Sequence, residues 1–181
     1  MKKPLLILSF ILISTIISAE SDISLKNLEN LAKQGNLTAQ TELAKSYRTG
    51  IGVTQDYKTA IKWFTLAAEQ GDAVSQYNLG IMHSFGLGVV PNYRHGVKWY
   101  TLAAEQGHAL AQYNLGRLYY LGKGVPENLI YAHMWAKQAS SNGFKMGTEF
   151  TEMLTELMTE HQIEKANGLR IDCVIKKYKG C

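Results

Sequence analysis

The sequence repeats itself with a period of 36 residues. The stretch TLAAEQGDAVSQYNLG at 65–80 returns as TLAAEQGHALAQYNLG at 101–116. Three blocks align without gaps, at 37–72, 73–108 and 109–144. A tryptophan stands at the same place in each block: Trp63, Trp99 and Trp135. A fixed period of 20–50 residues indicates a stacked architecture in which each repeat is one supersecondary unit.

Each block is predicted to form two helices. In the first half of block one, Ala39, Leu43 and Tyr47 recur every four residues and give one apolar stripe. A Gly-x-Gly-Val turn then ends the helix, where a positive φ is needed. Apolar residues in the second half follow the i, i+3, i+4, i+7 spacing of an amphipathic helix. Residues suited to its N-cap stand at equivalent positions: Asp56, Asn92 and Asn128.

Small and large residues alternate in these helices. Ala44, Gly80 and Gly116 remove bulk, so that paired helices can approach each other. One helical pair cannot bury its own apolar face, whereas stacked pairs bury each other's. The predicted fold is therefore all-α, an α-α superhelical solenoid of three 36-residue helix-turn-helix repeats with N- and C-terminal capping helices.

Both ends of the solenoid have a predicted cap. Residues 21–36 form an N-terminal half-repeat, because they share the register of the second helix of block one but carry polar residues. Residues 145–181 form the C-terminal capping helices, which begin in first-helix register. Thr159 and Gln162 predict a capping box that opens a final helix, ending at about Tyr178 at the latest.

Residues 1–20 have the layout of a cleavable signal peptide. Lys2 and Lys3 precede an apolar core, and small residues follow, with cleavage expected after Ala19 or Ser21. The core is about 13 residues long, whereas roughly 18–20 are needed to span a bilayer. A retained membrane anchor is the alternative. We expect a periplasmic or secreted protein of a Gram-negative bacterium, with no transmembrane segment after cleavage.

The two cysteines, Cys173 and Cys181, are predicted to form a disulfide. A close pair usually joins in an oxidising compartment. Eight residues of continuous helix span about 12 Å, whereas a disulfide needs Cα atoms within roughly 7 Å. The helix must therefore end between the two cysteines, and Gly180 helps the chain to turn back. The alternative, a metal or redox pair, lacks the CxxC spacing.

Few sequence features point to chemistry. The net charge of +4 is too small to indicate nucleic-acid binding. The Gly-x-Gly turns complete neither a GxGxxG nor a P-loop motif. The five histidines form no HExxH motif, His83 occupies a core aromatic position, and His108 lies in a turn. No catalytic residue, metal site or cofactor is predicted, although a triad assembled across helices stays an open alternative.

The repeated motifs resemble the Sel-1-like repeat (SLR), a relative of the tetratricopeptide repeat. They are Q-Y-N-L-G, then Y-x-x-G-x-G-V, then W-x-x-x-A-A-E-Q-G, over 37–144 and in part to about 165. The resemblance implies an α-α superhelix that mediates protein–protein contacts, and bacterial members are often exported. His83 replaces the usual Tyr and Gly96 the usual Ala. The cysteine pair of some exported members is missing, which weakens any transfer of their penicillin binding or hydrolysis.

Solenoid geometry predicts one binding surface. In stacked helical pairs the first helices line the concave side, where tyrosine and arginine often anchor partners and an exposed apolar band marks an interface. The predicted partner-binding residues are Lys45, Arg48, Tyr77, Phe85, Tyr113, Arg117 and Tyr120. Tyr77 and Tyr113 have an alternative, structural role.

The leading hypothesis is an exported, non-enzymatic scaffold that binds another protein or a peptide segment on its concave face. A glycan- or peptidoglycan-binding envelope module, whose aromatic groove stacks sugars, is the second hypothesis. An enzyme that acts on β-lactams or peptidoglycan is the third.

Overall fold

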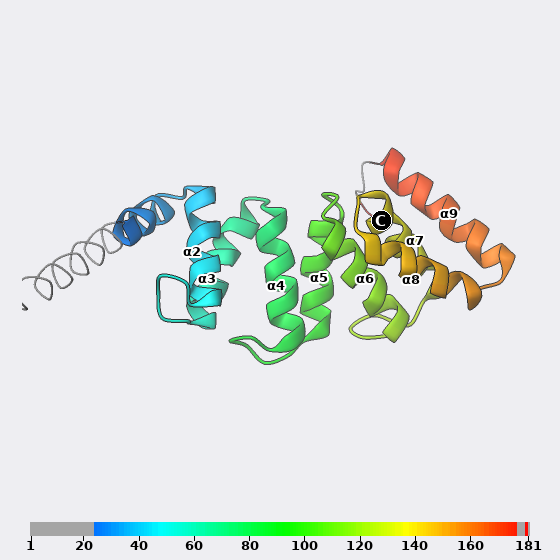
Figure 1. Cartoon of the computed structure of the whole chain (residues 1–181), viewed down its shortest axis with the longest axis horizontal. Helices are drawn as coiled ribbons and strands as arrows, with labels where there is room; N and C mark the ends of the chain where they lie inside the picture. Colours follow the sequence, from blue (N-terminus) through cyan, green and yellow to red (C-terminus); the bar gives the residue numbers. More distant parts are fainter. Residues whose placement is uncertain (1–23, 177–179, 181) are drawn as a thin grey trace, which may run out of the picture. The chain divides into compact units, whose positions relative to one another are not determined.

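The computed structural model describes residues 24–176 and residue 180, and every regular element in this part of the chain is a helix (Figure 1). The predicted all-α repeat fold is confirmed. The predicted signal segment 1–20 and Cys181 lie outside the described residues. Among the helices that are described, none has the length and apolar character needed to cross a membrane.

A helix over residues 24–33 precedes the repeats. The elements that follow are α2 (Leu37–Thr49), α3 (Tyr57–Glu69), α4 (Ala73–Phe85), α5 (Tyr93–Ala104), α6 (Ala109–Leu121), α7 (Leu129–Ser141), α8 (Lys145–Glu156) and α9 (Glu160–Ile175). The first helices of the three repeats are α2, α4 and α6, and the second helices are α3, α5 and α7. The chain divides between Trp63 and Phe64, inside α3, into two compact units.

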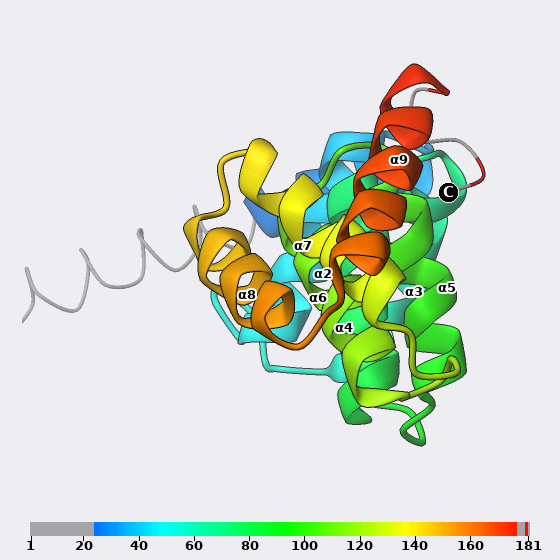
Figure 2. The ribbon, with the colours of Figure 1, turned by 90° about the vertical axis from the view of Figure 1, so that its right-hand side faces the viewer.

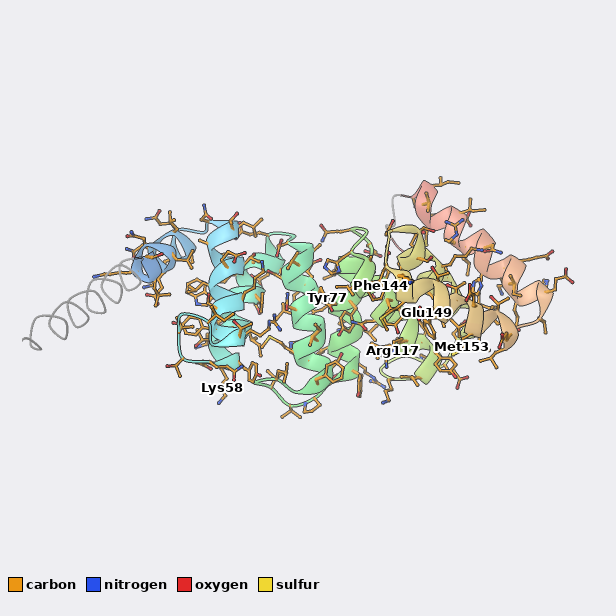
Figure 3. The ribbon with its side chains drawn as sticks, viewed as in Figure 1. Lys58, Tyr77, Arg117, Phe144, Glu149 and Met153 are labelled. Carbon is orange, nitrogen blue, oxygen red and sulfur yellow. The ribbon has the colours of Figure 1, made fainter. Side chains whose placement is uncertain are left out.

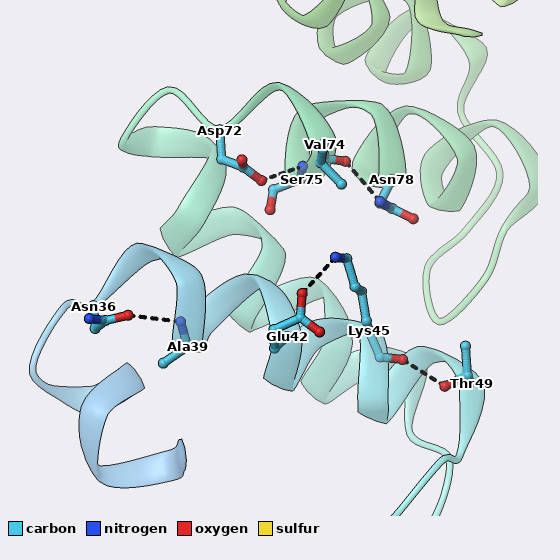
Figure 4. Close-up of polar contacts among 9 residues, drawn as sticks. All are labelled: Asn36, Ala39, Glu42, Lys45, Thr49, Asp72, Val74, Ser75 and Asn78. Carbon is cyan, nitrogen blue, oxygen red and sulfur yellow. Dashed lines mark hydrogen bonds and ion pairs between the residues drawn. The ribbon is translucent and has the colours of Figure 1, made fainter. Parts of the chain in front are cut away.

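Polar side chains begin the repeat helices. At the N-cap of α2 the Asn36 side chain accepts a hydrogen bond from the Ala39 amide at 2.9 Å, and Asp72 accepts one from Ser75 at 2.7 Å before α4 (Figure 4). These bonds satisfy amides that have no partner within the helix. The three predicted caps of the second helices are also present: Asp56 accepts from the Lys58 amide, Asn92 from the His95 amide and Asn128 from the Tyr131 amide.

A glutamine at the same position of each repeat bonds its first helix to the helix that precedes it. In the 64–181 unit, Gln76 Nε2 donates to the Ala68 carbonyl at 3.1 Å, and Gln112 Nε2 donates to the Ala104 carbonyl at 3.0 Å. The Gln112 side-chain oxygen accepts from Asn142 at 2.9 Å. In the 24–63 unit, Gln40 Nε2 likewise donates a hydrogen bond to the Ala32 carbonyl at 3.0 Å. The glutamine thus satisfies a carbonyl at each helix C-terminus, which the helix itself leaves unpaired.

Small residues allow the predicted close approach of paired helices. A Cβ on Gly80 would lie 2.5 Å from the Tyr100 ring, and one on Gly116 would lie 3.0 Å from the Ala132 carbonyl. The turn after α4 also needs its glycine, because Gly86 has φ +72 and a Cβ there would lie 2.5 Å from Pro91.

The largest fully buried side chains of the 64–181 unit include Trp135, Tyr100, Phe64, Leu79, Met82, Leu115 and Met134.

The C-terminal helices complete the 64–181 unit. Helix α8 continues the first-helix register, since it begins 36 residues after α6. Helix α9 packs on α7, as Figure 2 shows from the end of the molecule. It opens with the predicted capping box, in which Thr159 and Gln162 bond reciprocally. Cys173 of α9 is buried against Met134 and Trp135. Because Cys181 lies outside the described residues, its disulfide with Cys173 stays a prediction.

Candidate binding surface

The exposed sides of α4, α6 and α8 share one register, and we call this surface the first-helix face. Figure 3 marks Tyr77 on α4, Arg117 on α6, and Glu149 and Met153 on α8. Two rows of exposed apolar residues recur every 36 positions along it. The first row is Val74, Leu110 and Met146, and the second is Phe85, Leu121 and Leu157. Their exposed fractions are 37–50% in the first row and 46–64% in the second.

A cleft opens beside the second row, where α4 and α5 face α6. It holds about 80 Å³ and is lined by Ser84, Phe85, Tyr93, Tyr100, Asn114, Arg117, Leu118, Leu121 and Lys123. Its floor is polar, because Ser84, Tyr100 and Asn114 line it, and the buried Ser84 hydroxyl has no hydrogen-bond partner among the described residues. Burial raises the pKa of Tyr100 above its ordinary value, so the phenol keeps its proton.

Two cations stand at the mouth of the cleft. Arg117 and Lys123 are both exposed. The Lys123 ammonium lies 5.2 Å from the centre of the Tyr93 ring, and the Arg117 guanidinium lies 5.9 Å from the centre of the Tyr113 ring. Neither cation has an ion-pair partner within residues 24–176. The described residues that line the cleft include no carboxylate, so the cleft carries a positive charge.

The next junction along the solenoid, between α6 and α8, is filled by aromatic rings. The Tyr113 ring centre lies 5.0 Å from that of Phe144 and 5.6 Å from that of Phe150. The ring centres of Tyr120 and Phe150 are 5.9 Å apart. All three pairs are edge-to-face, an arrangement that stabilises beyond simple burial. In the 36-residue register Phe150 corresponds to Asn114, which lines the open cleft.

Tyr77 is engaged with the start of the next first helix. Its ring stacks on His108, with centres 4.6 Å apart and planes at 25°. His108 is the N-cap of α6, and its Nδ1 accepts from the Ala111 amide at 3.3 Å. Burial lowers the pKa of His108, which favours the neutral ring that this cap requires. The histidine predicted to lie in a turn therefore has a capping role.

The structure brings two of the seven predicted partner-binding residues together, since Phe85 and Arg117 both line the cleft. Tyr77, Tyr113 and Tyr120 are half-buried in the ring contacts described above. The remaining two lie in the 24–63 unit. Lys45 Nζ pairs with Glu42 at 2.7 Å (Figure 4). Arg48 is half-buried, and its Nε has no hydrogen-bond partner in the described chain. A role of these residues in binding stays a prediction.

Sequence reasoning overlooked the contributions of α8 and of the inter-helix turn. Met146, Met153 and Leu157 extend the exposed apolar surface onto α8. Continuing the 36-residue register by one block would have placed them there. Lys123 occupies the variable position of the Gly-x-Gly turn, which is Leu87 in the preceding repeat. Comparing the turns for charge would have identified it.

Two further histidine environments lie outside the cleft. His83 is half-buried and meets His95 edge-on, with ring centres 5.5 Å apart; burial and the nearby His95 lower its pKa. His133 of α7 is buried, and its Nε2 lies 3.2 Å from the Thr155 hydroxyl. Burial and Lys137 lower the pKa of His133. Within residues 24–176 and 180, no three or more His, Cys, Asp or Glu side chains are grouped closely enough to hold a metal ion.

Comparisons with known proteins agree with this geometry. The Sel1 repeat family model matches residues 37–72, 73–108 and 109–144. A Sel1 repeat protein from Oxalobacter formigenes is 35% identical with a TM-score of 0.65, over 71% of this chain and 97% of that one. A protective antigen of uropathogenic Escherichia coli strains with an SLR fold is 31% identical with a TM-score of 0.56. That match covers 85% of this chain and 41% of the antigen. None of the curated proteins matches the chain significantly.

Proposed function

We propose that this chain, which belongs to the Sel1 repeat family, is an exported, non-enzymatic scaffold. Repeats of this family generally serve as protein–protein interaction modules, and the scaffold would bind a segment of another protein on the first-helix face. The features of residues 1–20 support the export. The geometry of α4, α6 and α8 supports the binding surface.

The two periodic rows of exposed apolar residues carry the proposal. Single exposed apolar side chains are normal on a protein surface. Here six of them recur at fixed register positions on or directly after α4, α6 and α8, as in Phe85, Leu121 and Leu157. A partner segment that runs across the helices would therefore meet an apolar side chain on each one. Exposed apolar side chains that gather on one face in this way indicate an interaction site.

The chemistry of the surface favours a protein segment over a sugar polymer. Sugar stacking needs free aromatic faces. Of the four predicted aromatic binding residues only Phe85 is exposed, because Tyr77, Tyr113 and Tyr120 already contact other rings. Most of the exposed residues in the rows are aliphatic side chains or methionines. Such side chains fit the apolar side chains of a peptide, as in groove recognition of amphipathic segments.

Site-specific cross-linking in the native envelope tests the proposal. A photo-reactive residue replaces Leu121 on the first-helix face or, as a matched control, Leu102, an exposed leucine of the second helix α5. We expect discrete protein adducts from position 121 only. Those adducts should disappear when Phe85 and Leu157 are also changed to Ser, and should persist when Leu66 and Leu102 are changed instead.

Other outcomes would contradict the proposal. Equal adducts from both positions would remove the first-helix face as the site, and adducts with peptidoglycan fragments would support the glycan hypothesis. Turnover of a chromogenic β-lactam by the purified protein would support the enzyme hypothesis. The export is checked separately by mass spectrometry of the mature N-terminus, which we expect to follow Ala19 or Ser21.

A further inference from the structure

We infer that the cleft between α4 and α6 receives the carboxylate of an aspartate or glutamate side chain within the partner segment. This inference rests on the proposed function and specifies the chemistry of the partner. The polar groups in the cleft are suited to donating hydrogen bonds. They are the Arg117 guanidinium, the Lys123 ammonium, the Asn114 amide, and the Tyr100 and Ser84 hydroxyls.

Charge makes the cleft selective for an acid. Arg117 and Lys123 have no ion-pair partner in the described chain, so their charge is available to a ligand. A guanidinium matches a planar carboxylate with two parallel hydrogen bonds. Hydrogen bonds to charged groups are roughly twice as strong as those between neutral groups. A carboxylate should therefore be preferred over the amide of the same shape.

The size of the cleft limits what can enter. Its volume is about 80 Å³, whereas clefts that enclose drug-sized molecules measure roughly 300–1,000 Å³. A carboxylate with one or two methylenes is small enough for such a space, and a sugar ring or a β-lactam nucleus is too large to be enclosed. The cleft accordingly suits one side chain of a larger ligand that lies outside it.

The surroundings fix where the acid lies in the partner. Phe85 and Leu121 form the apolar wall of the cleft, so the acid should adjoin apolar residues. The second row continues past the cleft to Leu157, so the partner chain runs on along the surface and the carboxylate belongs to a side chain rather than to a chain end. On α8, Glu149 and Glu156 are exposed and would repel an acid.

Peptide selection tests the inference on the full mature chain. Random 12-residue peptides displayed on phage are selected for binding to the protein. Peptides that also bind the variant with Phe85, Leu121 and Leu157 changed to Ser are then removed. Enriched peptides are then synthesised with blocked ends, so that no terminal carboxylate is present. We expect each to carry an Asp or Glu beside apolar residues, and its replacement by Asn or Gln to weaken binding about ten-fold.

Protein variants locate the effect at the cleft. Arg117→Gln and Lys123→Gln should each reduce the preference for the acid over the amide peptide, measured by fluorescence anisotropy at physiological salt. Arg94→Gln is the matched control, because Arg94 is an exposed cation of α5 that does not line the cleft. Arg117→Glu should reverse the preference in favour of a peptide with Lys in place of the acid.

The outcomes separate this inference from the proposed function. If no peptide is enriched over the triple serine variant, both fail. If peptides are enriched but bind equally well with the acid or its amide, only the carboxylate inference fails. An effect of Arg94→Gln as large as that of Arg117→Gln would also overturn it, because general charge attraction would then replace a specific cleft.

Discussion

Two neighbouring junctions of the solenoid share one register and differ in what fills them. Between α4 and α6, Ser84 and Asn114 leave a small polar cleft. Between α6 and α8, the equivalent positions hold Tyr120 and Phe150, whose rings pack edge-to-face. The backbone period is the same at both junctions, so the difference lies in the side chains, and these two register positions contribute to it.

This comparison separates scaffold from recognition. The period, the helix caps and the glutamine bonds recur along the three repeats, and they say little about ligands. A pair of short polar side chains at one junction creates a place where a partner group can enter. A pair of aromatic side chains at the next junction turns the same place into core.

The largest expected effect comes from emptying the closed junction. Phe150→Ala removes the ring that contacts both Tyr113 and Tyr120 and should lower the free energy of unfolding by about 3 kcal/mol. Asn114→Ala at the equivalent position should cost less than about 1 kcal/mol, because it lines a space that is already open. Urea unfolding of both variants measures the difference, and equal costs would contradict the comparison.

The next effect comes from filling the open junction. Asn114→Phe copies Phe150 into the cleft and should abolish the preference for an acidic peptide over its amide. Its free energy of unfolding should stay within about 1.5 kcal/mol of the wild type, because the added ring enters existing space. Peptide anisotropy and urea unfolding measure the two quantities. An unchanged acid preference would show that the acid binds elsewhere.

A smaller effect concerns pH at the α7–α8 contact. Burial lowers the pKa of His133 below the 6.5 of the unfolded chain. The unfolded state therefore binds more protons as the pH falls through 6.5, and the free energy of unfolding should decrease below that pH. His133→Gln should flatten this dependence between pH 7 and pH 5 more than His83→Gln, because His83 is only half-buried. Identical slopes in the two variants would contradict a larger contribution from His133 than from His83.

The smallest effect separates charges that serve binding from charges that serve folding. Arg117→Gln should change the free energy of unfolding by less than about 0.5 kcal/mol, because Arg117 is exposed and has no ion-pair partner in residues 24–176. Glu42→Gln breaks the exposed pair with Lys45 and should have an equally small effect. Thermal unfolding checks both. A large loss in Arg117→Gln would indicate a structural role for that charge.

Much of the fold follows from the sequence, because period, capping and close packing are local or strictly repeated. Asn92, Asn128 and Thr159 are predicted as caps from position alone, and the structure places them there. Gly80 is predicted as a point of close approach and is one, against the Tyr100 ring.

The binding surface is harder to predict, because it depends on pairs of side chains from different helices. Tyr77 and Tyr113 share a register position, and their rings are engaged because His108 and Phe144 reach them from the next helix boundary. No property of the tyrosines themselves reveals this. The cleft likewise depends on Asn114 being shorter than Phe150, which a single register position does not show.

One isosteric change tests the central claim most directly. Asn114→Asp places a carboxylate inside the cleft with almost no change in shape. We predict that the variant keeps the wild-type affinity for the amide form of a selected peptide and binds the acidic form no better than the amide form. A preference for the acidic peptide equal to that of the wild type would contradict the account.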